Sequence, residues 1–171
     1  MKLFASPILC LAMLQIASAQ QSTVFTEWFS SNEGGFSVVA PGKLKQNVER
    51  REKAGDLHQF VLDRKNGAYL VTYESMDPQL YDTPEKLDAA YERGLSGVLQ
   101  AWGGKLLKKK EITISKNSAR EYTIDIPARQ GKARVRMLLA NGKFYQTMAL
   151  GGGDFANTEE ADSFLDSFEL N

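Results

Sequence analysis

The chain has little of the chemistry that many enzymes use. It contains one cysteine, Cys10, and one histidine, His58, among 171 residues. Because Cys10 lies in an N-terminal stretch that we expect to be removed, the rest of the chain has no thiol for catalysis, disulfide formation or metal binding. A catalytic triad would have to use His58, whose place beside Phe60 and Leu62 indicates a half-buried sheet residue instead. The sequence also lacks a G-x-S-x-G motif, a P-loop and a dinucleotide-binding fingerprint.

The N-terminus has the features of a secretory signal peptide. Lys2 supplies the positive charge, residues 3–16 are mostly apolar, and Ala17-Ser18-Ala19 is an A-x-A cleavage signal. The apolar run is too short for a membrane-spanning helix. We therefore expect cleavage after Ala19, and a periplasmic or extracellular protein that consists of one domain, residues 20–171. A domain of about 150 residues buries roughly 68–70% of its chain surface, so it can fold without a disulfide.

The stretch 119–150 predicts three consecutive antiparallel strands. Asn141-Gly142 is typical of a type I′ turn, which pairs Ala140 with Lys143 and Leu139 with Phe144. Side chains two residues apart then share a face. The face that we expect to be buried carries Ala133, Val135, Met137, Leu139, Phe144, Met148 and Leu150. The opposite face carries Arg134, Arg136, Leu138, Tyr145 and Thr147.

Residues 57–63 and 68–74 predict a second hairpin around Asn66-Gly67. The same reasoning pairs Leu62 with Val71, and it places His58, Phe60, Leu62, Tyr69, Val71 and Tyr73 on one face. A short strand is expected at 36–39, one or two strands at 106–115, and a charged edge strand at 44–51. We expect Lys116-Asn117-Ser118 to form a turn and Gly151-Gly152-Gly153 to break the sheet.

Two helices are predicted. Thr83 is a good N-cap with Pro84 at the first helical position, and Gly103-Gly104 can end the helix. Between them, apolar residues recur at helical spacing: Leu87, Ala90, Tyr91, Gly94, Leu95, Val98, Leu99 and Trp102. Asn157 followed by Glu160 resembles a capping box, and the last helix would bury Ala161, Phe164, Leu165 and Phe168.

Four segments together resemble secreted bacterial proteins of the PsbP-like fold. They are GGFSVVAPGKLKQ (34–46), GAYLVTYESMDP (67–78), SAREYTID (118–125) and FLDSFEL (164–170). The resemblance implies an α+β fold with a central twisted antiparallel sheet and helices on both faces, and a cystatin-like α+β arrangement is the alternative. The fold also occurs in an extrinsic subunit of photosystem II and in a nuclear-import factor that acts on a small GTPase. No single catalytic constellation characterises it, so the resemblance assigns no site residues and no cofactor.

The charges balance overall but are unevenly distributed. Residues 105–143 hold eleven basic side chains and three acidic ones, whereas 154–169 hold six acidic and no basic ones. Lys108-Lys109-Lys110 and the strand with Lys132, Arg134 and Arg136 form a candidate basic face for an anionic envelope polymer, lipid headgroups or an acidic protein. The candidate binding residues are Lys132, Arg134, Arg136 and Tyr145. An exported chain of near-zero net charge is not expected to bind nucleic acid.

Three functions are compatible with these features. The first is a non-catalytic exported domain that binds or helps to assemble another envelope component, with no metal or cofactor. The second is a hydrolase that uses a pair of carboxylates in a cleft between sheet and helix. The third is a carrier of a small ligand or metal ion. A buried carboxylate pair with raised pKa would favour the second, and thermal stabilisation by a ligand would favour the third.

The Asn141-Gly142 turn gives a first testable prediction. In a type I′ turn Gly142 has a positive φ, which a β-branched residue tolerates poorly. We therefore expect Gly142→Val to lower the free energy of unfolding by about 1 kcal/mol or more. Urea unfolding measures the change, and an unaltered midpoint would contradict the predicted hairpin.

Overall fold

A computed structural model describes residues 26–52 and 55–171, so the predicted signal peptide lies outside the described residues. The helices are α1 (Pro84–Trp102) and α2 (Glu159–Asp166), and three short 3-10 helices are η1 (Pro78–Leu80), η2 (Pro127–Arg129) and η3 (Phe155–Asn157). The strands are β1 (Glu27–Ser31), β2 (Phe36–Ala40), β3 (Lys45–Glu49), β4 (Leu57–Arg64), β5 (Gly67–Ser75), β6 (Lys105–Ile114), β7 (Asn117–Ile126), β8 (Gly131–Ala140), β9 (Lys143–Gly152) and β10 (Glu169–Leu170).

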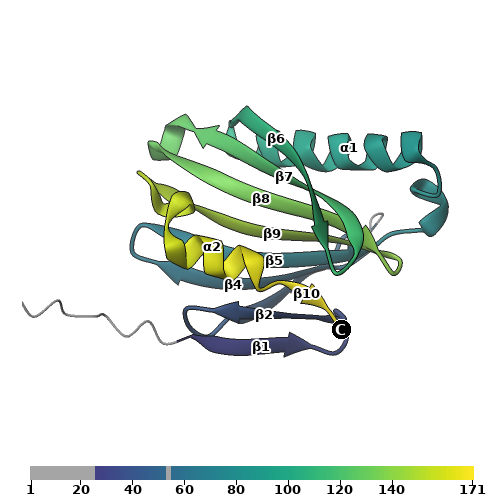
Figure 1. Ribbon diagram of the computed structural model, residues 1–171, viewed down its shortest axis with the longest axis horizontal. Coiled ribbons are helices and arrows are strands. Elements are labelled where there is room, and N and C mark those ends of the chain that lie inside the picture. The colour runs from purple at the N-terminus through teal and green to yellow at the C-terminus, as the bar shows by residue number, and fades with distance from the viewer. Residues whose placement is uncertain (1–25, 53–54) are drawn as a thin grey trace, which may run out of the picture.

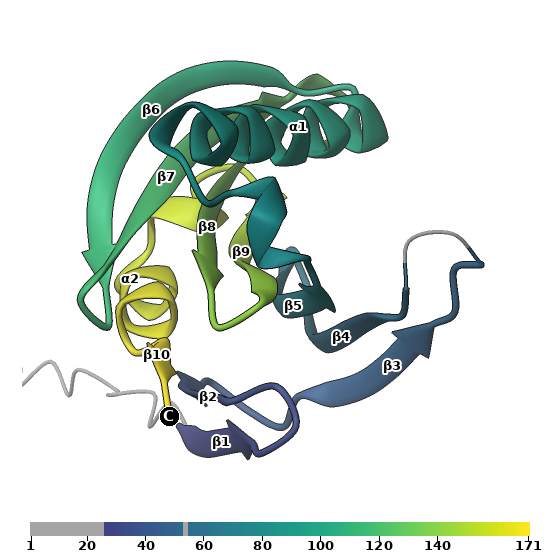
Figure 2. The ribbon, with the colours of Figure 1, turned by 90° about the vertical axis from the view of Figure 1, so that its right-hand side faces the viewer.

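Seven strands form one antiparallel sheet in the order β3-β4-β5-β9-β8-β7-β6, and β1-β2-β10 form a small second sheet. Helix α1 lies on one face of the large sheet, whereas α2 and the small sheet lie on the other (Figures 1 and 2). The predicted α+β fold class, with a central antiparallel sheet between helices, is therefore confirmed.

The α1 side of the sheet has a mainly aliphatic core. Helix α1 begins at Pro84 after the N-cap Thr83 and ends before Gly103, whose φ of 59° is left-handed, as predicted. Asn141 and Gly142 both have positive φ, and Leu139 pairs with Phe144 in the predicted register. All the residues of β8 and β9 that were expected to be buried are buried, and they pack against the apolar face of α1.

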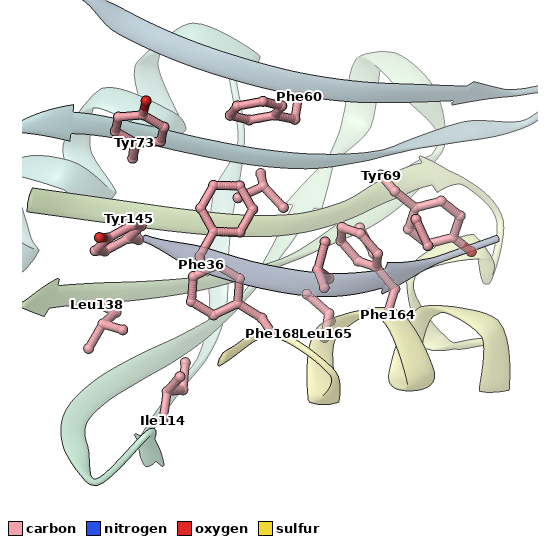
Figure 3. Packing of buried hydrophobic residues seen from close by; sticks show 14 of the residues in the cluster. Phe36, Phe60, Tyr69, Tyr73, Ile114, Leu138, Tyr145, Phe164, Leu165 and Phe168 are labelled. Carbon is pink, nitrogen blue, oxygen red and sulfur yellow. The ribbon is translucent and has the colours of Figure 1, made fainter. Parts of the chain in front are cut away.

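The opposite side has an aromatic core, in which Phe36 of β2 is central (Figure 3). Its ring contacts Phe60, Tyr73, Tyr145 and Phe168, with ring centroids 5.4–6.4 Å apart. These rings come from β2, β4, β5, β9 and the segment after α2. The small sheet and α2 are therefore joined to the large sheet by one continuous apolar cluster.

Local details of three turns differ from the prediction. Leu62 pairs with Tyr69, not Val71, because the first turn consists of Lys65 and Asn66. The turn between β6 and β7 consists of Ser115 and Lys116, which both have positive φ. Strand β9 continues through Gly151 and Gly152, so these glycines do not break the sheet.

The cap of α2 also differs from the prediction. Its N-cap is Thr158, whose hydroxyl accepts a hydrogen bond from the amide of Ala161, while Asn157 lies in η3. The predicted capping box is therefore wrong by one residue. The side chains expected to be buried, Ala161, Phe164, Leu165 and Phe168, are all buried.

Two glycines of α1 differ sharply in the space around them. A Cβ on Gly94 would lie 2.6 Å from Cζ of Phe144, whereas a Cβ on Gly97 would have nothing within 4 Å. Alanine has the higher helix propensity, but overpacking a core costs about 1–3 kcal/mol. We expect Gly94→Ala to destabilise the protein and Gly97→Ala to stabilise it by about 0.5–1 kcal/mol. Urea unfolding of the two variants is the measurement, and equal effects would contradict the packing of α1.

Candidate functional site

Arg134 and Arg136 of the predicted basic face make internal ion pairs. Both guanidinium groups bond the same carboxylate of Glu121 on β7, at 3.2 Å from Arg134 and 2.7 Å from Arg136. Arg134 also pairs with Asp162 of α2, and Arg136 donates to the carbonyl oxygen of Leu165 at 2.8 Å. The two arginines therefore hold α2 on the sheet, and the structure does not present them as a free basic surface.

The other two predicted binding residues are in different environments. Tyr145 is 1% exposed, and its hydroxyl donates to the carbonyl oxygen of Gly34 at 2.7 Å. Tyr145 is thus part of the aromatic core. Lys132 is partly exposed and pairs in register with Asp125 of β7. The structure brings these four residues onto one face, but only Lys132 makes no hydrogen bond or ion pair within the described part of the chain.

The signal for this arrangement was present in the sequence. The acidic segment 154–169 contains Asp162 and Asp166, the partners of Arg134 and Arg136. The pattern of charges was therefore consistent with ion pairs between the last helix and the strand that carries Arg134 and Arg136. From the sequence alone, the basic residues were instead interpreted as a face for an external partner.

A groove on the opposite face is the best-formed candidate site. Helix α1 is anchored toward one side of the sheet, because the Tyr91 hydroxyl donates to the carbonyl oxygen of Ser118 at 2.9 Å. The guanidinium of Arg120 lies 4.8 Å from the centre of the Tyr91 ring and pairs with Asp88 of α1. These contacts place α1 over β7 and β8, so β4 and β5 are not covered by it (Figure 2).

The groove between α1 and the uncovered strands has a volume of about 590 Å³. Its walls are mostly apolar and include Leu57, Leu70, Met76, Val98, Trp102, Phe144 and Met148. Gly97 and Ala101 of α1 keep it open, since both residues are small. This volume lies within the range of about 300–1,000 Å³ that is typical of small-molecule sites.

A polar row crosses the floor of the groove. Gln59, Thr72 and Gln146 are direct cross-strand neighbours on β4, β5 and β9. Gln59 accepts a hydrogen bond from Asn47 at 3.3 Å, and Thr72 and Gln146 line the groove beside it. The floor therefore offers amide and hydroxyl groups to a ligand between apolar walls.

Charged residues lie at the rim of the groove. Arg51 and Glu74 form an ion pair there, and Arg93 of α1 is exposed and makes no ion pair among the described residues. None of these residues was proposed from the sequence. They come from strands and a helix that are distant in the chain, so no local motif could have revealed them.

Other candidates have structural explanations. His58 is half-buried as predicted and stacks on Tyr73, with ring centroids 4.4 Å apart. Burial, followed by the nearby Glu33 carboxylate, raises the pKa of Tyr73 to about 12. The amides of Gly152 and Gly153 donate to the carbonyl oxygens of Asn66 and Gln130 in the neighbouring loops. The described residues contain no cluster of three or more potential metal ligands.

Comparisons with known proteins identify the fold. No protein-family model matches the sequence, and neither does any curated protein. The solution structure of the cyanobacterial PsbP protein of Synechocystis is similar, with a TM-score of 0.60 and 14% identity over 89% of this chain and 96% of that one. A Pseudomonas aeruginosa protein of unknown function reaches a TM-score of 0.41 at 12% identity over 77% of this chain and 86% of that one.

The fold and the groove together define an α+β domain that has one partly covered sheet face. More particularly, the likeness to the Synechocystis protein shows that the chain has the PsbP-like fold, as its sequence segments indicated. At 14% identity this likeness establishes the fold alone, so function has to be argued from the site. In the described part of the chain, neither helix has the length and apolar character to cross a bilayer.

The Glu121 carboxylate gives a pH-dependent prediction. Burial acts to raise its pKa, but the hydrogen bond from Arg136 and the charges of Arg134 and Arg136 outweigh burial and lower it. A carboxyl group with a lowered pKa stabilises the fold above its unfolded value of about 4.5, and this contribution is lost as the pH falls through the folded pKa.

We expect Glu121→Gln to lower the free energy of unfolding at pH 7 by about 1–3 kcal/mol, because two partly buried guanidinium groups lose their shared partner. The difference from wild type should shrink below pH 4.5. Urea unfolding at pH 7, 5 and 3 measures both effects. Asp166→Asn is the control. Because Asp166 is largely exposed, this substitution should lower the free energy of unfolding by less than about 1 kcal/mol. A pH-independent difference for Glu121→Gln would refute the assigned ionisation.

Proposed function

We propose that the protein is an exported, non-catalytic binding domain that binds another component of the cell envelope or helps to assemble it. The groove between α1 and strands β4, β5 and β9 is its binding site. The observation that carries this proposal is the combination of apolar walls with a polar floor. Such a combination is typical of ligand sites, where apolar contacts supply affinity and a few polar groups fix orientation.

The chemistry of the groove favours an amphipathic ligand that carries an acidic group. Leu70, Met148 and Trp102 suit an apolar body, and the guanidinium of Arg93 at the rim suits an anionic end. Gln146 and Thr72 can bond a polar group along the body. A medium-chain carboxylate is the simplest molecule with these properties and can be used as a probe.

The carboxylate-dependent hydrolase is the second candidate, and the groove does not favour it. Glu74 is the only acidic side chain among the described residues that line the groove, and it is paired with Arg51. Glycosidase-type hydrolysis needs two carboxyl groups that face one substrate. A binding function therefore fits this site better.

The prediction compares decanoate with 1-decanol, which has the same chain length and no charge. We expect decanoate to raise the melting temperature of the wild-type protein by mass action, and to bind more tightly than decanol. Arg93→Gln should weaken decanoate binding by roughly fivefold, since exposed ion pairs contribute about 1 kcal/mol, and should leave decanol binding unchanged. Isothermal calorimetry measures both affinities.

Gly97 supplies the matched pair of variants for this test. Gly97→Phe places a large side chain in the open groove without a clash at Cβ, whereas Gly97→Ala leaves most of the space free. Gly97→Phe should therefore abolish decanoate binding and remain folded, and Gly97→Ala should still bind. Equal binding by both variants would show that the groove is not the site.

A further inference from the structure

Strand β6 has a surface that neither the groove nor the ion pairs under α2 explain. It is the outer strand of the large sheet, so one side of its backbone has no neighbouring strand within that sheet (Figure 2). Leu106 is 42% exposed and Leu107 is 56% exposed. Of the large apolar side chains exposed in the described residues, these are the only two that are adjacent in the chain.

The same strand carries a concentration of positive charge. It contains four lysines and one acidic residue, Glu111. Lys109 pairs with Glu92 of α1 at 2.6 Å, whereas Lys105, Lys108 and Lys110 make no ion pair within the described residues. Lys132 is on the same sheet face as Lys105, because both pair in register with Asp125. The charge on this edge is therefore only partly balanced.

Protection of a sheet edge explains the lysines but not the leucines. Charged side chains and bulges on edge strands prevent pairing with other chains, and β6 has both, since its register shifts between Leu106 and Lys108. This bulge also makes β6 a poor template for an added protein strand. Two exposed leucines would weaken such protection, so they require a different explanation.

We propose that the β6 edge binds the surface of an anionic phospholipid bilayer. Lys105, Lys108 and Lys110 contact the phosphate groups, and Leu106 and Leu107 enter the boundary between headgroups and acyl chains. Juxtaposed basic and apolar side chains are the usual elements of peripheral membrane binding. The headgroup region is also hydrated, so the unpaired backbone groups of the strand are still able to form hydrogen bonds.

The test is sedimentation of the full chain with vesicles of phosphatidylcholine, with and without phosphatidylglycerol. We expect binding that requires phosphatidylglycerol and weakens as salt rises from 20 to about 300 mM, because screening shortens the range of the attraction. Lys108→Glu with Lys110→Glu should reduce partitioning by about tenfold or more. Leu107→Ser should remove the part of the binding that persists at high salt.

A matched control uses the opposite edge of the same sheet. Lys43→Glu with Lys45→Glu makes the same change in net charge near β3, where both side chains are exposed, and should change partitioning by less than twofold. Thermal unfolding confirms that all variants are folded. The proposal is overturned by equal losses in the two double variants, by an absence of binding to phosphatidylglycerol vesicles, or by binding to soluble polyaspartate but not to vesicles.

Discussion

One helix cannot cover one face of a seven-stranded sheet, and this constraint shapes the molecule. Strands about 4.8 Å apart make a sheet roughly 30 Å wide, whereas a helix with its side chains is about 10–12 Å across. Helix α1 must therefore leave part of the face open. The contacts of Tyr91 with Ser118 and Arg120 decide which part, because they fix the helix over β7 and β8. The groove exists because α1 lies to one side of the sheet and leaves β4 and β5 uncovered.

The other face of the sheet is also wider than one helix, and more elements cover it. The small sheet and α2 together cover it, and their apolar residues form one cluster around Phe36. At the margin of that cluster, Arg134 and Arg136 are bonded to Glu121 and to α2, so their positive charge is used inside the fold. The two faces therefore differ in kind: one is closed by packing and ion pairs, and the other is partly open. A ligand is more easily accommodated on the open face.

The sequence predicted those features that local rules determine. Thr83, Pro84 and Gly103 define the ends of α1 because caps depend on neighbouring residues only. Asn141-Gly142 fixed its hairpin because both positions require positive φ. Asn66-Gly67 was misleading, since the chain turns one residue earlier and glycine starts β5. A two-residue turn of this composition is a strong signal, but packing of the neighbouring strands can shift it.

The candidate sites could not be predicted in the same way, because they depend on which elements cover which face. Arg134 and Arg136 are exposed on an isolated hairpin and become paired only when α2, far along the chain, is placed over them. Gln59, Thr72 and Gln146 form one row only through the order β4-β5-β9, which no local pattern specifies. Most elements could therefore be predicted from the sequence, whereas β10, the small sheet and the ion pairs of Arg134 and Arg136 could not.

The groove and the β6 edge are physically connected through the end of α1. Trp102 lines the groove, and β6 begins three residues later at Lys105. The connection is tightly packed, since a Cβ on Gly104 would lie 2.7 Å from Cγ2 of Ile124. A bilayer against β6 would thus lie beside the Trp102 end of the groove. Such a bilayer can hold amphipathic molecules with an acidic group. The groove and the β6 edge therefore suit ligands of related chemistry, although the two proposals depend on different residues.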